Sequence, residues 1–351
     1  MRATRPEPEK IRAAGKDNPD LRERDLAQRL GISEAEFVAA HCGLSVIRID
    51  PRVDELLPAL PALGEVMALT RNESAVHEKI GPFEKVTAGR HAALVLGEQI
   101  DLRIFPKHWA FGFAVEKGVG VDVRRSLQFF DAAGDAVHKV HLRPASNREA
   151  YLTLVQRFAA ADQSQTVDVQ PPTPAVSRPI PRVEPQDLRD RWSAMTDVHQ
   201  FVGILRALDL TRREAVHLIG TDYAWPLATD AVPAMMARSV EAGLPIMCFV
   251  GNRGCIQIHS GPISNVKPIG PWLNVMDETF HLHLRIDRIR ELWAVRKPNS
   301  EGHVTSVEAY DAAGELIIQF FGKRREGEDE RREWREVVEV LPLEKNQVDA
   351  A

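Results

Sequence analysis

The sequence predicts an α+β protein made by internal duplication of one unit, in which N-terminal helices precede a largely antiparallel β-sheet meander. Segments of the first half recur in the second half at a nearly fixed offset. Each half begins with helical patterning and continues into short apolar stretches rich in β-branched and aromatic residues. Alternating strand–helix–strand units are not evident, so a parallel sheet is disfavoured.

The duplication is visible in matching segments whose positions differ by 180, or by 178 near the start of each half. The matches are Asn72 with Asn252, 81–82 with 261–262, 131–134 with 311–314, 30–33 with 208–211, and Glu36 with Glu214. Chance could supply one such match, but several at nearly one offset make duplication the better explanation. Ser33 and Thr211, which match each other, are candidate helix N-caps.

The expected helices and strands follow this repeat. Helical patterning covers residues 25–40 and 198–219, and the strand-like stretches are 92–96, 100–105, 126–130, 246–250, 280–286 and 304–310. The Asp-Ala-Ala-Gly segments at 131–134 and 311–314 lie between strand-like runs, where Asp and Gly suit a tight hairpin turn. Residues 323–335 are rich in charge, and we expect a solvated helix with charge pairs around Trp334.

Six prolines between Gln170 and Gln186 mark the expected domain boundary, because such a run favours an extended, semi-rigid spacer. We therefore expect an N-terminal repeat over residues 1–165, a proline-rich linker over 166–188 and a C-terminal repeat over 189–345. A long ordered surface loop is the alternative interpretation of the proline-rich run.

Composition narrows the functional classes. Lys and Arg number 45 against 50 Asp and Glu, a net charge of -5, so the electrostatic footprint of a general nucleic-acid binder is missing. No segment is apolar enough for a secretory signal or a membrane span, so we expect a cytoplasmic protein without membrane insertion. The three cysteines, Cys42, Cys248 and Cys255, lack paired spacing, which fits reduced thiols rather than disulfides or a zinc site.

One histidine stands out because of its neighbours. His199 lies at the edge of a helical apolar stripe that includes Phe201 and Val202, and Gly203 leaves that face of the helix low. A flat ligand could therefore lie against the imidazole, although a hydrogen-bonded surface histidine is the alternative interpretation. His281 and His283 share one strand face without an apparent third ligand, so a polar strand face is favoured there over a metal site.

Several motifs in both halves resemble the haemin-degrading factor family of the HemS and ChuS type. In the second half they are MTDVHQF at 195–201, FVGNRGC at 249–255 and RKP at 296–298; in the first half they are TRNESAVHE at 70–78, DLRIF at 101–105 and SLQFFD at 126–131. The resemblance covers nearly the whole chain apart from its first residues, the proline-rich linker and the tail.

The resemblance implies that haem, iron protoporphyrin IX, binds in a cleft of the C-terminal half with His199 as the axial iron ligand. It also implies that Arg103 reaches the opposite face of the iron, so that His199 and Arg103 are the catalytic pair. The residues that it implies for binding the propionates and the ring are Arg212, Lys297, Gln319, Phe321 and Arg324. For each basic residue the alternative is a solvated surface charge. Phe321 stands where the family carries tyrosine, so a ring contact is retained and a hydroxyl hydrogen bond is lost.

The resemblance further implies oxidative haem degradation that releases iron for iron acquisition, with electrons from an external reductant. An electron donor and the haem import machinery are then the expected protein partners, and a homodimer is left open. A haem carrier or storage protein without turnover is one alternative, since the same residues would bind the haem. A protein-binding scaffold in which His199 is structural is the other.

Overall fold

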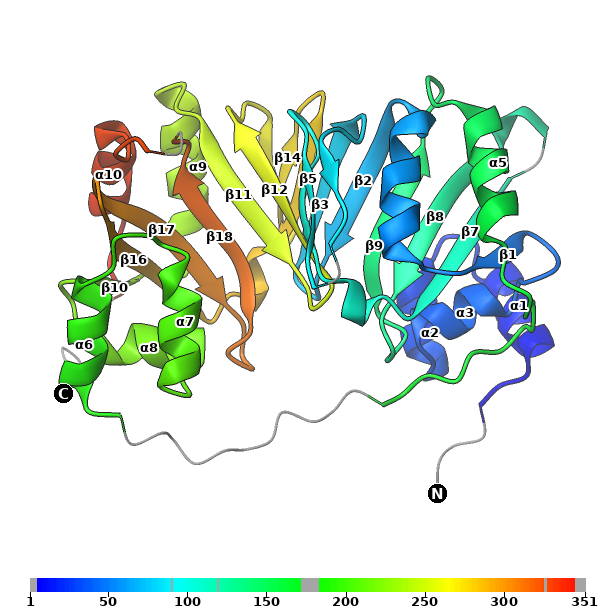
Figure 1. Ribbon diagram of the computed structural model, residues 1–351, viewed down its shortest axis with the longest axis horizontal. Coiled ribbons are helices and arrows are strands. Elements are labelled where there is room, and N and C mark those ends of the chain that lie inside the picture. The colour runs from blue at the N-terminus through cyan, green and yellow to red at the C-terminus, as the bar shows by residue number, and fades with distance from the viewer. Residues whose placement is uncertain (1–4, 90, 119, 172–182, 325–326, 345–351) are drawn as a thin grey trace. The chain divides into compact units, whose positions relative to one another are not determined.

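The computed structural model of the chain describes residues 5–89, 91–118, 120–171, 183–324 and 327–344, and it divides into two compact units (Figure 1). Unit 1 comprises Met1–Arg71, His77–Pro174 and Gly251–Gln257, and unit 2 comprises Asn72–Val76, Ala175–Val250 and Ile258–Ala351. The predicted linker lies partly outside the described residues, at 172–182, so the boundaries 1–165, 166–188 and 189–345 stay predictions. No helix in the described ranges combines the length and the apolar character needed to cross a membrane.

The first half of the chain carries the helices α1 to α5 and the strands β1 to β9. In chain order they are α1 (Pro8–Asp17), α2 (Glu23–Leu30), α3 (Glu34–Ala39), β1 (Val46–Ile49), α4 (Val53–Leu56), β2 (Val66–Arg71), β3 (Ala75–Gly81), β4 (Val86–Thr87), β5 (Ala93–Leu96), β6 (Asp101–Ile104), β7 (Phe111–Lys117), β8 (Arg124–Phe130), β9 (Ala136–Leu142) and α5 (Arg148–Phe158). Within unit 1, the strands β1, β7, β8, β9 and β2 are antiparallel neighbours in that order, and β4, β5 and β6 pair successively.

The second half repeats this arrangement element by element. Its elements are α6 (Pro185–Ser193), α7 (Gln200–Ala207), α8 (Arg212–Leu218), β10 (Ala224–Leu227), α9 (Ala231–Glu241), β11 (Ile246–Gly251), β12 (Cys255–Gly261), β13 (Val266–Ile269), β14 (Trp272–Met276), β15 (Phe280–Arg285), β16 (Glu291–Asn299), β17 (Gly302–Tyr310), β18 (Leu316–Gly322) and α10 (Arg332–Glu339). Within unit 2, β10, β16, β17, β18 and β11 are antiparallel neighbours, and β13, β14 and β15 pair successively.

Strand register confirms the duplication and the α+β class. Gln128 pairs with Lys139 between β8 and β9, and Glu308 pairs with Gln319 between β17 and β18, at an offset of 180 in both strands. A β-bulge interrupts each pair at the equivalent place, between Phe129 and Phe130 in β8 and between Ala309 and Tyr310 in β17. The expected strand-like stretches all lie in strands, with ends that shift by one or two residues.

The helical patterning predicted over 25–40 and 198–219 is confirmed, and in each half it is divided into two short helices. Gly31 and Asp209 adopt left-handed backbone conformations, with φ of 69° and 52°, which end α2 and α7. Ser33 and Thr211 then begin α3 and α8 with a complete capping box, which confirms them as N-caps. The helix pairs lie beside their sheets as α2 with α3 and α7 with α8 (Figure 1).

The two Asp-Ala-Ala-Gly segments form the predicted hairpin turns. Asp131 Oδ1 accepts hydrogen bonds from the backbone N–H groups of Ala133 and Asp135, and Asp311 makes the equivalent pair. Gly134 and Gly314 close the turns at positive φ, 85° and 79°. A side-chain cap and a left-handed glycine thus join β8 to β9 and β17 to β18 in the same way.

Each unit contains a short segment from the other half of the chain. The side-chain amide of Asn252 donates to the backbone carbonyls of Arg71 and Val137, both at 2.9 Å, within unit 1. The amide of Asn72 donates to the carbonyl of Ile317 at 2.8 Å within unit 2. Since Val137 and Ile317 are equivalent in the repeat, the two asparagines have the same role in the two units.

The C-terminal helix is buried on one face, which corrects the solvated helix predicted over 323–335. Helix α10 begins at Arg332, and Trp334 is completely buried beside Val338 in the core of unit 2. The indole N–H of Trp334 donates to the carbonyl of Thr305 in β17 at 2.9 Å. The prediction stopped at residue 335, and therefore missed the apolar period that continues through Val338 to Leu341.

In unit 1 a buried carboxylate joins the helix pair to the sheet. Glu34 of α3 accepts from the ammonium of Lys139 in β9 at 2.5 Å and pairs with Arg71 in β2. Burial alone would raise the pKa of Glu34, but the positive charges of Lys139 and Arg71 outweigh burial and lower it to about 2. The carboxylate therefore stays ionised in the folded unit.

We predict that Gly31→Ala lowers the free energy of unfolding by about 1 kcal/mol, because alanine resists the left-handed conformation that ends α2. No heavy atom lies within 4 Å of the added Cβ, so the effect is conformational rather than steric. Gly15→Ala in α1 is the matched control and should be neutral or stabilising. Urea denaturation of both variants checks this, and equal shifts of the same sign would contradict it.

Glu34→Gln should remove part of the acid sensitivity of the fold. The folded pKa of about 2 lies below the ordinary 4.5, so the stabilisation by Glu34 is present above about pH 4.5 and is lost as pH falls toward 2. The expected loss at neutral pH is of the order of 3 kcal/mol. The urea midpoint of the variant should vary less with pH than that of the wild type between about pH 3 and about pH 6. Glu149→Gln, at an exposed carboxylate of α5, is the control.

Candidate functional site

His199 presents its imidazole to solvent at the start of α7. It is the N-cap of the helix, its side chain is 87% exposed, and Nδ1 lies 2.7 Å from Oδ1 of Asp197. The same oxygen accepts the backbone N–H of His199 at 2.8 Å. These backbone and side-chain hydrogen bonds lower the pKa of Asp197. An ionised Asp197 favours the proton on Nδ1 and leaves the Nε2 lone pair available, and no hydrogen-bond partner for Nε2 occurs among the described residues.

The face of α7 beside His199 is open. A Cβ added at Gly203 would meet no heavy atom within 4 Å, and Val202 is 53% exposed. Val202 of the apolar stripe is therefore exposed to solvent. Phe201, in contrast to Val202, faces the core, where its ring packs edge-on against Trp192 at 4.9 Å between centroids. The side chain of Val202 and the backbone at Gly203 are thus accessible to solvent on the helix that His199 begins.

Three of the predicted site residues converge on one buried carboxylate, that of Glu308 in β17. Its Oε1 atom accepts from Nζ of Lys297 in β16 at 2.8 Å, from Nη1 of Arg212 in α8 at 3.2 Å and from Nε2 of Gln319 in β18 at 2.9 Å. These donors come from three different elements. The sequence therefore predicted residues that lie together, although it did not predict the group that joins them.

The Glu308 carboxylate is fully enclosed by polar partners. Its side chain is 0% exposed, Ser306 donates to Oε1 at 2.9 Å and the hydroxyl of Tyr310 donates to Oε2 at 2.7 Å. Burial alone would raise the pKa of Glu308, but the charges of Lys297 and Arg212 hold it well below its usual range. Lys297 is itself buried, so the interpretation of that residue as a solvated surface charge is excluded.

Phe201 connects this cluster to the helix that carries His199. The guanidinium carbon of Arg212 and the ammonium of Lys297 each lie 4.9 Å from the centroid of the Phe201 ring. Such distances allow favourable cation–π contacts. Because Phe201 follows His199 by two residues, the imidazole and the cationic cluster belong to one region of unit 2.

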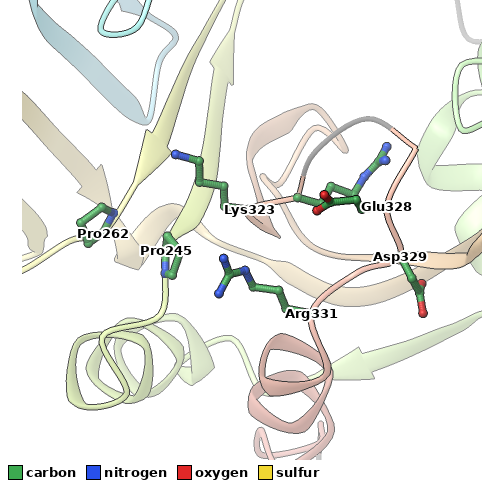
Figure 2. A pocket seen from close by; sticks show the side chains of 7 residues that line it. Pro245, Pro262, Lys323, Glu328, Asp329 and Arg331 are labelled. Atoms are coloured by element: carbon green, nitrogen blue, oxygen red, sulfur yellow. The ribbon is translucent and has the colours of Figure 1, made fainter.

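Phe321 and Arg324 lie at the end of β18 and after it. The ring of Phe321 contacts that of Phe249 at 4.9 Å between centroids. Arg324 is half-buried, and its charge contributes to lowering the pKa of Asp197, the partner of His199. Arg324 also lines an open pocket of about 580 Å³, whose other lining residues are Pro245, Pro262, Lys323, Glu328, Asp329 and Arg331 (Figure 2). Figure 2 shows Arg331 extending toward Pro245 in this pocket.

Arg103 lies in unit 1, on β6. Its guanidinium pairs with Asp101, and its side chain is 35% exposed. The role implied for Arg103 stays a prediction.

The strand histidine His283 lies in unit 2 and contacts Asn274 through Nδ1 at 2.6 Å. No group of three or more His, Cys, Asp or Glu in the described part of the chain could hold a metal ion.

The equivalent region of unit 1 has the opposite polarity. The residues at the repeat positions of His199, Arg212, Glu308 and Gln319 are Leu21, Glu34, Gln128 and Lys139. The carboxylate is thus on the helix in unit 1 and on the sheet in unit 2. No imidazole stands at position 21, so unit 1 has no histidine at the position equivalent to His199.

Two residues that matter in this site were missed by sequence reasoning. Asp197 lies inside the motif at 195–201, two residues before His199, where a carboxylate can contact the imidazole. Glu308 is an acidic residue in the middle of a strand-like stretch, a place where acidic side chains are disfavoured. The sequence therefore contains both acidic residues at unusual positions, but it does not show which side chains contact them.

Comparison with known proteins now adds to this geometry. The haemin-degrading HemS.ChuX domain matches residues 31–158 and again 209–341. The hemin transport protein HemS of Yersinia enterocolitica is 39% identical over 327 residues, covering 93% of this chain and 94% of that protein.

Two solved structures are similar over nearly their full length. Holo-PhuS, a heme-binding protein from Pseudomonas aeruginosa, has a TM-score of 0.92 at 42% identity, covering 96% of this chain and 99% of that one. The heme degrading enzyme ChuS of Escherichia coli O157:H7 has a TM-score of 0.87 at 36% identity, covering 94% and 97%. The chain therefore belongs to the haemin-degrading HemS.ChuX family, whose domain it carries twice.

Proposed function

We propose that this protein binds haem through His199 and opens the porphyrin ring oxidatively, with electrons supplied from outside the chain. The observation that carries the proposal is the exposed imidazole of His199, whose Nδ1 is held by Asp197. A histidine that binds metal commonly donates its second ring N–H to a carboxylate, which fixes the tautomer and raises the basicity of the ligating nitrogen. His199 has that arrangement.

The porphyrin propionates require cations or hydrogen-bond donors. Arg212 and Arg324 are only partly buried and are the cations that we assign to them. Glu308 holds one nitrogen of Arg212, and the described residues take no other hydrogen bond from that side chain. Gln319 and Phe321 line the same region of unit 2, and Phe321 contributes a ring without a hydroxyl group.

Bound haem would supply the iron that activates oxygen. The residues of the chain would bind and orient the haem and provide the electrostatic environment around the iron. For Arg103 we propose the role of a cationic hydrogen-bond donor toward the reacting oxygen, as the family resemblance implies. The chain offers no internal source of electrons that the sequence identifies, so an electron donor is a proposed partner. Haem import machinery is the other, and the cytoplasm is the proposed location.

A haem carrier is the second candidate, and the name of the relative HemS favours it. HemS is called a hemin transport protein and PhuS a heme-binding protein, whereas ChuS is called a heme degrading enzyme. Binding and ring opening use the same iron ligand, so the geometry at His199 is compatible with both a carrier and an enzyme. Turnover is the property that separates them.

His199→Ala should abolish or strongly shift the Soret band that wild-type protein gives with haemin, because the substitution removes the axial nitrogen. The matched control is His217→Ala, a partly exposed histidine of α8 that contacts Glu291. Titration of haemin into each protein, followed by absorption spectroscopy, is the measurement. A wild-type spectrum identical to haemin in buffer would refute haem binding.

The enzyme and the carrier differ once a reductant is added to the complex, with catalase present to remove free peroxide. The enzyme predicts a single tetrapyrrole product together with released iron. An unchanged haem spectrum over many minutes would identify the carrier instead.

Arg103→Ala should retain haemin binding and slow ring opening by about tenfold or more, because a preorganised cationic donor acts chiefly on developing charge. Arg125→Ala, which breaks a similar arginine–carboxylate pair with Glu116 in unit 1, is the control and should turn over haem at the wild-type rate. Single-turnover spectra compare the three proteins. Equal rates for all of them would remove Arg103 from the mechanism.

A further inference from the structure

We propose that the hairpin formed by β14 and β15 in unit 2 binds a monovalent copper ion, Cu(I), on the face that is turned away from the core. The ligands are the imidazoles of His281 and His283 and the thioether of Met276. The sequence shows only the two histidines as a pair, because the third ligand comes from the neighbouring strand. None of the three belongs to the proposed haem site.

Strand pairing places the three side chains on one face. His281 and His283 are two residues apart on β15, so both project to the same side of the strand. On the neighbouring strand, Met276 stands opposite His281 and Asn274 stands opposite His283. Residues directly opposite each other in an antiparallel pair have Cβ atoms about 5 Å apart. The contact between Nδ1 of His283 and Oδ1 of Asn274, at 2.6 Å, shows that these pairs share a face.

The opposite face of the hairpin fixes the register of the two strands. Its side chains are buried in the core of unit 2; they are Leu273, Val275, Leu282 and Leu284. A slip of one residue would bring these side chains to the surface, so the pairing of Met276 with His281 is strongly specified. Met276 is 43% exposed and both histidines are partly exposed, so an ion in solution can reach all three ligands.

Asn274 fixes the tautomer of His283. The amide nitrogen of Asn274 donates to the backbone carbonyl of Lys267 at 3.2 Å, so its amide oxygen faces the imidazole. An amide oxygen only accepts hydrogen bonds, so Nδ1 of His283 carries the proton and donates it. The lone pair of the ring is then on Nε2. Histidines that bind metal commonly donate their second ring N–H to an oxygen in this way.

Unit 1 shows that side chains at the equivalent positions meet. The repeat equivalents of the two histidines are Asp101 and Arg103 on β6, and these two side chains form an ion pair. The equivalent of Met276 is Leu96 of β5, which stands opposite Asp101 and is 41% exposed. The strand therefore brings side chains two residues apart into contact. Since leucine occupies the equivalent exposed place in unit 1, the fold does not require a thioether there.

The donor set selects the metal. Thioether sulfur is a soft ligand that favours Cu(I), and imidazole also binds copper. Two neutral imidazoles and a thioether carry no negative charge to balance a divalent ion. Lys267 stands opposite Asn274 on β13 and adds a positive charge to this face, which repels a doubly charged ion more than a singly charged one.

The cysteine thiols are the competing soft ligands of the chain, and all three are buried. They are Cys42, Cys248 and Cys255. Burial raises the pKa of each thiol, to about 12 for Cys255, so the thiols stay protonated at neutral pH. A copper ion added to the folded chain therefore meets imidazole and thioether before it meets thiolate.

Competition with the chelator bicinchoninate measures the Cu(I) affinity of the full-length protein without haem. His281→Gln and Met276→Leu should each weaken Cu(I) binding about tenfold or more, because each substitution removes one of three ligands. His217→Ala removes a partly exposed histidine of α8 that contacts Glu291, and this control should bind Cu(I) as tightly as the wild type. Equal affinities for the wild type and His281→Gln, or a wild type that binds no Cu(I), would overturn the proposal.

X-ray absorption at the copper edge identifies the sulfur ligand. The wild type should show two nitrogen neighbours and one sulfur neighbour, and Met276→Leu should lose the sulfur. A sulfur neighbour that persists in Met276→Leu would place the ion on a cysteine and would contradict the proposal. His283→Gln should also weaken binding, but it removes the partner of Asn274. Should that variant not fold, His281→Gln and Met276→Leu decide the question.

Discussion

A buried carboxylate between two cations joins a helix to the sheet in each unit. In unit 1 the carboxylate is Glu34 of α3, held by Arg71 and Lys139 of the sheet. In unit 2 it is Glu308 of β17, held by Lys297 within the sheet and by Arg212 of α8. A buried charge is stable only when it is paired, so the helix in each unit has one favourable position on its own sheet. The remaining geometry of the candidate site depends on this constraint.

The two clusters have opposite arrangements of charge on the helix and on the sheet. In unit 1 the carboxylate lies on the helix and takes up both cations of the sheet. In unit 2 the helix contributes a cation, Arg212, which shares the carboxylate of Glu308 with Lys297. Each cluster therefore combines two cations with one carboxylate, and the units differ in His199, whose equivalent position in unit 1 is occupied by Leu21.

Local signals predicted much of the fold from the sequence alone. Ser33 and Thr211 begin helices, and Asp131 with Gly134 forms a hairpin turn, because caps and tight turns depend on residues that are neighbours in the chain. The end of α7 is harder to predict from local signals, because Asp209 adopts a left-handed backbone conformation that aspartate permits but does not require. Trp334 was placed in solvent because its apolar partners lie beyond the charged run.

The site was predicted as a set of residues rather than as an arrangement. Resemblance identified Arg212, Lys297 and Gln319, yet Glu308 joins them from a fourth element. Such contacts depend on strand register and helix docking, which no single segment specifies.

The most direct test of the proposed haem site is a crystal structure of the chain with haemin. We expect Nε2 of His199 on the iron and a propionate on Arg212. Iron ligated by another residue would contradict this account.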